Sequence, residues 1–293
     1  MGQLPYALAA FDLDDTLLRE DGCMSAFTRD CLRQAQAQGL RIALASGRPV
    51  QAMERIADEL EMAAHDGFLI AFNGAQIVCC STGEQLYSCM LDRPDQLWLC
   101  QKAREWGAFV HVYDGSRLLT PQANEYTDIE SRLTGLEAVV CPDLPFVIPP
   151  YTPKVLMMQA PARLAEIERQ LAGQACGRFA LCRSKPYFLE CVRPQVCKGA
   201  ALKQLCAHLR VPLPQTIAMG DSYNDLSMLQ AAGVGVAMGN APAAIREKAD
   251  LVTDTCARDG AAQALCRLLQ GEAWPSEAFP TGGATRGVLH SAP

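Results

Sequence analysis

The first apolar run of the chain is followed by an acidic segment, DLDDT, at residues 12–16. In open α/β sheets, ligands bind beyond the carboxyl ends of the strands, where Asp12 and Asp14 are expected to lie. If the chain curls just after Asp12, the two carboxylates converge and repel each other unless a cation joins them. Because oxygen ligands suit Mg²⁺, the pair predicts a magnesium site. The alternative interpretation is a solvated acidic junction without chemistry.

Two further motifs could hold an anion. Ser46 follows the apolar run 41–45 and offers a hydroxyl donor, while Gly47 lets the backbone approach a ligand where a helix begins. Lys198 lies just ahead of another helix, where its charge opposes the helix dipole, and a lysine there suits a phosphate oxygen. Taken singly, Ser46 is better explained as an ordinary helix cap and Lys198 as a solvated surface lysine.

A fourth motif, GDSYND at residues 220–225, directly follows another apolar run. Asp221 ends a predicted strand as Asp12 does, and Asn224 and Asp225 fall on the first turn of the next helix. Acid and amide groups at this spacing can share a metal and its surroundings, although a capping turn has the same composition. All four motifs fall at strand ends of one predicted sheet. Together they indicate a nucleophilic carboxylate, a metal, a hydroxyl and a lysine around an anion.

Strand-like and helix-like segments alternate in both terminal parts of the chain, which favours βαβ units and a parallel sheet. The predicted strands cover residues 6–11, 41–45, 68–72, 76–80, 216–219 and 234–238. The predicted helices cover residues 28–38, 49–61, 198–209, 225–232 and 241–249. Asn73 and Gly74 separate two of these strands and form a strong turn signal.

The middle of the chain has a different texture and is interpreted as an α+β insert. The segments predicted there are strands over 110–113, 154–159 and 187–192 and helices over 93–106 and 162–171. A cluster of prolines between residues 142 and 153 indicates a linking stretch. The last residues, 272–293, combine Pro and Gly without periodicity, so we expect a mobile tail there.

The composition excludes several classes of protein. The 293 residues are 49% apolar and 20% charged, which is a globular rather than a disordered composition. The net charge of −6 argues against a general nucleic-acid binder, and no apolar run reaches the roughly 18 residues that span a bilayer. The start of the chain lacks the basic region of an export signal, and the 14 cysteines include no CxxC pair. We therefore expect a cytoplasmic protein with reduced thiols.

These motifs resemble those of the haloacid dehalogenase-like hydrolase superfamily and, within it, the Cof-type, sugar-phosphatase-like branch. The matching segments are FDLDDTLL at 11–18, ASGRP at 45–49, FNGA at 72–75, VCKGAAL at 196–202, MGDSYNDLSML at 219–229 and GVAMGNA at 235–241. The segment DTCARDGAA at 254–262 departs from the polar loop and Asp-Gly-Val that relatives usually carry. The resemblance implies an α/β fold, with a Rossmann-like parallel-sheet core over 1–82 and 191–271, an inserted cap over 83–190 and the tail 272–293.

The same resemblance implies a catalytic role for five residues. Asp12 would be the nucleophile that forms an aspartyl-phosphate, and Asp14 would be the general acid and base. The carboxylates of Asp12 and Asp221 and the backbone carbonyl of Asp14 would hold Mg²⁺. Lys198 would neutralise the transferring group, and Asp225 would orient Lys198 or metal-bound water.

Phosphate oxygens would be held by Ser46, by Asn224 and by the backbone at Leu13 and Gly47. The implied function is a Mg²⁺-dependent phosphatase that hydrolyses small phosphorylated metabolites, such as sugar phosphates. A phosphomutase or phosphotransferase using the same intermediate stays open, as does a non-catalytic protein that binds such metabolites. No nucleic-acid or membrane partner is expected, and the oligomeric state is left open. Selectivity is expected to come from the cap, with four polar or aromatic candidates: Tyr113, Arg183, Lys185 and Tyr187.

Overall fold

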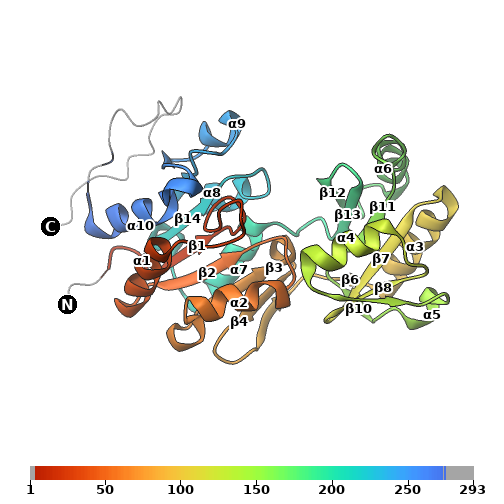
Figure 1. The fold of residues 1–293 in the computed structure, drawn as a ribbon, viewed down its shortest axis with the longest axis horizontal. Coiled ribbons are helices and arrows are strands. Elements are labelled where there is room, and N and C mark those ends of the chain that lie inside the picture. Colours follow the sequence, from red (N-terminus) through yellow and green to blue (C-terminus); the bar gives the residue numbers. More distant parts are fainter. Residues whose placement is uncertain (1–3, 273, 275–293) are drawn as a thin grey trace. The chain divides into compact units, whose positions relative to one another are not determined.

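The apolar run before Asp12 forms strand β1 (Leu8–Phe11), whose four residues are all fully buried. An uninterrupted apolar sequence of this kind suits a central parallel strand, which is covered on both faces. In the computed structural model, which describes residues 4–272 and 274, β1 pairs in parallel with β14 on one side and with β2 on the other. Figure 1 shows β1 between these two neighbours. The predicted parallel sheet is therefore confirmed.

Within the described residues this sheet has eight strands, in the order β16-β15-β14-β1-β2-β3-β4-β5. The strands that follow β1 are β2 (Arg41–Ala45), β3 (Phe68–Ala71), β4 (Gln76–Cys79), β5 (Gln85–Ser88), β14 (Thr216–Gly220), β15 (Val234–Ala237) and β16 (Leu251–Val252). Strand β4 runs antiparallel to β3, and a 3₁₀ turn over Phe72–Gly74 joins the two. That turn agrees with the signal of Asn73 and Gly74 in the sequence.

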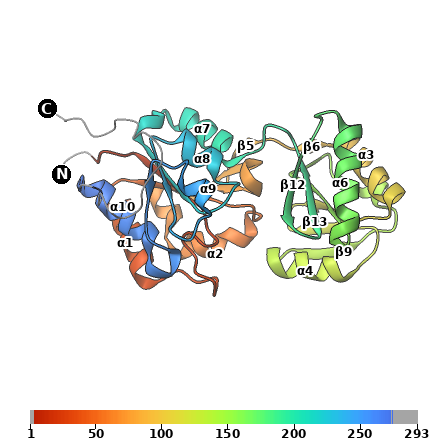
Figure 2. The same ribbon diagram turned by 90° about the horizontal axis from the view of Figure 1, so that it is seen from above.

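Helices cover both faces of this sheet. They are α1 (Ala26–Ala37), α2 (Gln51–Glu59), α7 (Lys198–Leu209), α8 (Leu226–Ala231), α9 (Ala243–Arg246) and α10 (Gly260–Gln270). Figure 2 shows α7 and α8 on one side of the sheet and α1 and α10 on the other. The predicted helix 241–249 is shorter than expected because Pro242 caps its start and the helix ends at Arg246. The α/β fold class is as predicted, whereas β5, β16 and α10 were not predicted from the sequence.

The described chain divides into two compact units. The first takes in residues 4–47, 53–87 and the described residues from 197 onward, and the second takes in 48–52 and 88–196. The mobile tail predicted over 272–293 lies, apart from Glu272 and Trp274, outside the described residues. Across residues 4–272 and 274, every helix is too short or too polar to cross a bilayer.

The second unit contains a mixed six-stranded sheet in the order β12-β13-β11-β7-β8-β9. Its strands are β7 (Phe109–Asp114), β8 (Arg117–Thr120), β9 (Glu137–Val140), β11 (Val155–Met158), β12 (Ala180–Lys185) and β13 (Phe188–Val192). Three of them, β7, β11 and β13, match predicted strands, whereas β8, β9 and β12 were missed. Strands β9 and β12 lie at the edges, β9 is largely exposed and β12 is partly exposed, and neither contains a buried residue, so they lack the apolar runs that mark buried strands.

Four helices accompany this second sheet: α3 (Arg93–Trp106), α4 (Glu125–Thr134), α5 (Leu144–Val147) and α6 (Pro161–Ala175). The sequence predicted α3 and α6 but not α4. The proline-rich stretch was interpreted as a linker, yet it contains α5 and also β10 (Tyr151–Thr152), which pairs with β6 (Leu91–Asp92). Proline suits the first turn of a helix because it needs no hydrogen bond there, and Pro145 occupies such a position in α5.

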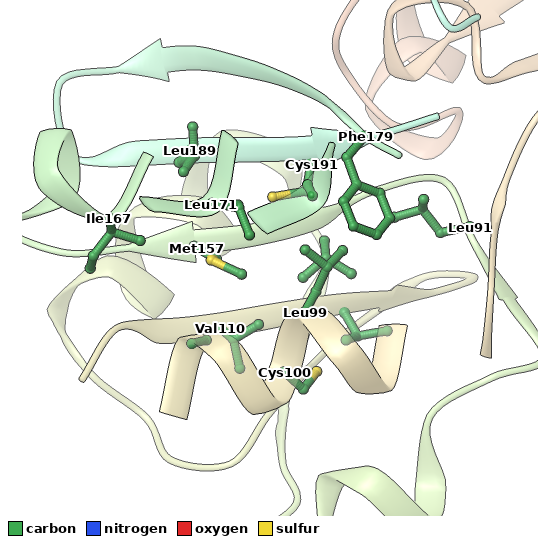
Figure 3. Close-up of a cluster of buried hydrophobic side chains, with 14 of the residues drawn as sticks. Leu91, Leu99, Cys100, Val110, Met157, Ile167, Leu171, Phe179, Leu189 and Cys191 are labelled. Atoms are coloured by element: carbon green, nitrogen blue, oxygen red, sulfur yellow. The ribbon is translucent and has the colours of Figure 1, made fainter. Parts of the chain in front are cut away.

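One face of the second sheet packs against α3 and α6 through a continuous apolar cluster. Figure 3 shows side chains of this cluster, including Leu99 from α3, Leu171 from α6 and Met157 from β11, all of which are fully buried. Burying such side chains stabilises a fold by about 1.5–3 kcal/mol each relative to exposure. This cluster lies wholly within the second unit, which therefore has a hydrophobic core of its own.

The opposite face of that sheet carries a buried polar network instead. The Nζ of Lys154 lies 2.8 Å from Oε1 of Glu190 and 3.9 Å from Oε1 of Glu130. The hydroxyl of Tyr113 donates to Glu130 at 2.5 Å, and His111 is hydrogen-bonded to Thr127 on α4 at 2.9 Å. Buried charges are tolerated when they are paired and hydrogen-bonded in this way. The network explains how α4 is held on the sheet without an apolar pattern that the sequence could reveal.

Candidate active site

The carboxyl ends of β1 and β14 bring two motifs of the sequence side by side. Phe11 of β1 is in register with Met219 of β14, and the N–H of Asp12 donates to the Met219 carbonyl at 2.9 Å. Asp12 and Asp221 therefore leave adjacent strands at the same edge of the sheet. From β1 the chain continues to β2 and β3 on one side, whereas β14, β15 and β16 lie on the other. Such a reversal of strand order is where open α/β sheets place their ligands.

Lys198 joins the charges at this edge. It is the first residue of α7 and is fully buried, and its Nζ donates to Oδ1 of Asp12 at 2.5 Å and to Oδ1 of Asp225 at 2.6 Å. A solvated surface lysine, which was the alternative interpretation, is therefore wrong. A buried ammonium needs anionic partners to offset its lost hydration, and the two carboxylates supply them.

Asp225 is held by hydrogen bonds on both of its carboxylate oxygens. Its Oδ1 accepts from Lys198, while its Oδ2 accepts from the backbone N–H groups of Asp221 at 3.0 Å and of Ser222 at 2.9 Å. Gly220 makes this approach possible, because a Cβ at that position would lie 2.5 Å from the Cβ of Asp225. The carboxylate of Asp225 thus orients Lys198 and also shapes the loop that carries Asp221.

The electrostatics of the cluster follow from burial and from the closeness of like charges. Burial raises the pKa of Asp12, the ammonium of Lys198 opposes that shift, and the nearby charge of Asp225 adds to it, so that the pKa lies at about 8. Burial and the charge of Asp225 raise the pKa of Asp221 to about 6. Burial alone would lower the pKa of Lys198, but the charges of Asp12 and Asp225 outweigh it and raise that pKa. The positive charge of Lys198 is therefore not enough to keep the pKa values of Asp12 and Asp221 at their ordinary level.

The donor set fits a hard divalent cation. Carboxylate oxygens of Asp12, Asp221 and Asp225 all lie within 4.8 Å of one another, and the three residues are buried. The oxygens of Asp225 accept from an ammonium and from two backbone N–H groups, which cannot turn away, whereas those of Asp221 accept from hydroxyl groups, which can rotate. Asp12 and Asp221 are therefore the side chains that suit a metal. A cation there would offset the burial and repulsion that raise their pKa values. Oxygen ligands of this kind are preferred by Mg²⁺ and Ca²⁺.

The remaining predicted residues lie around this edge with different degrees of exposure. Ser46 directly follows β2, the neighbour of β1, and is buried, whereas Asn224 is exposed after β14. Leu13 is fully buried, and its carbonyl accepts from the N–H groups of Thr16 and Leu18, which makes the turn after β1 tight. Asp14 is exposed on that turn and lies outside the buried cluster of Asp12, Lys198, Asp221 and Asp225.

Three residues that support the cluster were not singled out from the sequence. Thr16 is buried and donates to Oδ1 of Asp221 at 3.5 Å, and the hydroxyl of Ser222 donates to Oδ2 of the same residue at 3.1 Å. The side chain of Asn240 donates to the carbonyl of Asp15 at 2.8 Å and accepts from a backbone N–H of the 254–262 segment at 2.9 Å. All three lie within or next to the quoted motifs, so proximity to those motifs was the available signal.

Comparisons with known proteins agree with this architecture. A family model of haloacid dehalogenase-like hydrolases matches residues 9–265. YxeH of Bacillus subtilis, which is named as a phosphatase, is 32% identical over 268 residues, covering 90% of this chain and 98% of that protein. The HMP-PP phosphatase of Yersinia pseudotuberculosis is 32% identical over 241 residues, covering 80% of this chain and 85% of that protein.

A solved structure extends the similarity to the fold. The crystal structure of a haloacid dehalogenase-like hydrolase from Bacteroides thetaiotaomicron has a TM-score of 0.85 and 34% identity, covering 90% of this chain and 99% of that one. The resemblance seen in the sequence, including its Cof-type branch, is confirmed by these matches, and the enzyme class with which they agree is a phosphoric monoester hydrolase. With acidic motifs at the ends of β1 and β14 and a family model that spans both units, this chain belongs to the haloacid dehalogenase-like hydrolases.

Proposed function

We propose that this hydrolase is a Mg²⁺-dependent phosphatase of small phosphorylated metabolites, acting through an aspartyl-phosphate on Asp12. The observation that carries the proposal is the buried cluster of Asp12, Lys198, Asp221 and Asp225, in which Lys198 contacts both Asp12 and Asp225. Phosphoryl transfer depends mainly on positioning and charge stabilisation, and this cluster supplies both. The similarity to two relatives whose names contain the word phosphatase supports the same activity here.

The first half of the reaction uses a carboxylate as nucleophile. An oxygen of Asp12 forms a bond to phosphorus while the bond from phosphorus to the ester oxygen of the substrate breaks, and Asp14 donates a proton to that leaving oxygen. The ion pair with Lys198 engages Oδ1 of Asp12 and fixes the direction of the carboxylate. The exposed position of Asp14 on the turn after β1 suits a group that exchanges protons with a leaving alcohol and with water.

The second half returns the enzyme to its starting state. Asp14, now ionised, takes a proton from a water molecule as that water attacks phosphorus, and the bond from phosphorus to Asp12 breaks to release inorganic phosphate. Dividing hydrolysis into two displacements makes each of them easier than direct attack by water. The carboxylates of Asp12 and Asp221, with the backbone carbonyl of Asp14, would hold Mg²⁺, which supplies charge neutralisation between the anionic nucleophile and the anionic phosphate.

Residues around the carboxylates would hold the phosphate. We assign this role to the Ser46 hydroxyl, to the Asn224 side chain and to the backbone at Leu13 and Gly47. Ser46 and Gly47 follow β2, which pairs directly with β1, so their position is consistent with a ligand next to Asp12.

We propose that residues 83–190 act as the cap that selects the leaving group. Within the second unit, Tyr113 is only 1% exposed and is engaged with Glu130, so it is not a substrate contact, contrary to the expectation from sequence. Arg183 is paired with Glu168 at 2.8 Å, which leaves Lys185 and Tyr187 as the partly exposed candidates.

The test is turnover of p-nitrophenyl phosphate and of a panel of sugar phosphates and nucleotides by the wild type and by Asp12→Asn with Mg²⁺. The substitution is nearly isosteric and leaves Lys198 paired with Asp225, so we expect a folded protein without measurable turnover. Hydrolysis by Asp12→Asn at the wild-type rate would contradict the mechanism. Adding sugar acceptors and analysing the products separates release of inorganic phosphate, which we expect, from phosphoryl transfer to a hydroxyl.

A further inference from the structure

The turn between β3 and β4 holds an unusual backbone. Three consecutive residues, Phe72, Asn73 and Gly74, have positive φ angles of 50°, 56° and 103°. Glycine adopts this region freely and asparagine tolerates it, but a bulky residue such as phenylalanine is strained there. Strain of this kind persists only where surrounding contacts determine the conformation, and it is concentrated at functional sites.

The backbone of this turn contacts two of the loops at the site. The N–H of Asn73 donates to the carbonyl of Ser46 at 2.9 Å. Gly74 packs against the start of α7, because a Cβ there would lie 2.5 Å from the carbonyl oxygen of Cys197. The turn is thereby held between the loop that carries Ser46 and the helix turn that carries Lys198.

The side chain of Asn73 completes a third connection. Its Oδ1 accepts a hydrogen bond from Nδ2 of Asn224 at 3.0 Å. Its own Nδ2 lies over the backbone of Gly47, where a Cβ would approach it to 3.2 Å. Asn73 therefore lies between two groups that we assign to the phosphate, the Gly47 backbone and the Asn224 amide, although they are far apart in the sequence.

We propose that Asn73 is a positioning residue for the phosphate subsite, acting through Asn224; this rests on the proposed function. An amide nitrogen carries two hydrogens, and the bond to Asn73 engages one of them. The other is then presented in a fixed direction to a phosphate oxygen. Asn224 is exposed, so without this bond its side chain would sample several rotamers and would lose that freedom only on binding. The strained turn places the acceptor where Asn224 needs it.

A double-mutant cycle tests this role. Asn73→Gly keeps a residue that accepts positive φ and removes only the side chain, whereas Asn224→Ala removes the group that Asn73 positions. We expect each single variant to lower kcat/KM for p-nitrophenyl phosphate, and to raise the inhibition constant of inorganic phosphate, by about five- to tenfold, the size of one typical net hydrogen bond. The double variant is expected to be no worse than Asn224→Ala alone, because Asn73 acts only through the side chain that Asn224→Ala removes.

A matched control is Asp66→Gly, at an exposed residue with a φ of 50° before β3 begins, at the opposite end of that strand from the turn. We expect it to leave both constants unchanged. Losses by Asn73→Gly and Asn224→Ala that multiply in the double variant, or unchanged constants in Asn73→Gly, would overturn the role of Asn73. Those results leave wild-type turnover intact, whereas failure of the proposed function would appear as a wild-type protein that hydrolyses no phosphoester.

Discussion

Replacing Asp225 by asparagine separates the stability of the site from its chemistry. Asp225 is fully buried and makes three hydrogen bonds, from the ammonium of Lys198 and from the backbone N–H groups of Asp221 and Ser222. An amide has the same shape but carries no charge, and its NH₂ group must face either the ammonium or the two N–H groups. In either orientation, the NH₂ group of the asparagine faces other hydrogen-bond donors and accepts nothing from them. Lys198 then keeps only Asp12 as an anionic partner.

The size of the effect follows from that count of contacts. Breaking a buried ion pair by removing one charge costs about 3–5 kcal/mol, and unsatisfied buried donors cost about 1–3 kcal/mol each. The two penalties partly describe the same lost contacts, so they do not add in full. We therefore expect Asp225→Asn to lower the free energy of unfolding of the first unit by about 3–5 kcal/mol. For a unit of this size, that corresponds to a melting temperature lowered by about 6–20 °C.

The assay is urea denaturation, followed by circular dichroism, alongside turnover of p-nitrophenyl phosphate. Asp12→Asn is the matched control, since it leaves the contacts of Asp225 in place. It also breaks an ion pair with Lys198, but burial raises the pKa of Asp12 to about 8, so the charge of Asp12 is itself unfavourable in the metal-free protein and its loss should cost little stability. We expect both variants to lose turnover and only Asp225→Asn to unfold at a clearly lower urea concentration. An Asp225→Asn protein with the wild-type urea midpoint would refute the conclusion that this carboxylate anchors the site.

Two further predictions concern charge. The pKa of Asp12, raised to about 8, and that of Asp221, raised to about 6, lie above the value near 3.8 of an unfolded chain, so the metal-free protein should lose stability as the pH rises from about 4 to 8. The proposed Mg²⁺ ion would bind the ionised carboxylates, so the stabilisation by added Mg²⁺ in thermal unfolding should be larger near pH 8 than near pH 5.5, and an increment independent of pH would count against the metal site. In the second unit, Lys154→Met leaves Glu190 and Glu130 buried without their cation and should destabilise the protein by about 3–5 kcal/mol at neutral pH. A Lys154→Met protein with the wild-type midpoint in urea denaturation would disprove this explanation.

Local patterns in the sequence were sufficient for the central strands of the first sheet and for the identity of the polar residues at their ends. Apolar runs such as Leu8–Phe11 are continuous because the strand is buried on both faces, and this makes them recognisable without a structure. The helix 198–209 was predicted with its observed bounds, since a short apolar pattern and a following stop are local features. The family, too, was identified from residues close together in the chain, because motifs at strand ends stay contiguous.

Elements stabilised by distant partners were not visible in the same way. Strand β12 is an exposed edge strand that exists through its pairing with β13, and α4 is held by buried polar contacts such as Tyr113 to Glu130. Neither produces the periodicity by which helices and strands are recognised. Tyr113 also shows that an aromatic residue with a hydroxyl cannot be assigned to a surface or a core from its type alone.

The sequence by itself determined which residue types stand at the ends of the strands, and through them the family and the chemistry that the site can perform. Only the tertiary structure decided which charges meet. Lys198 lies 186 positions from Asp12 in the sequence and contacts it because α7, which begins at Lys198, packs on the sheet that contains β1. It likewise decided that Asp225 orients the lysine and that Asn73 touches Asn224. Hydrogen bonds and pKa shifts depend on distances of a few ångströms and on burial, and these arise only when segments far apart in the chain pack together.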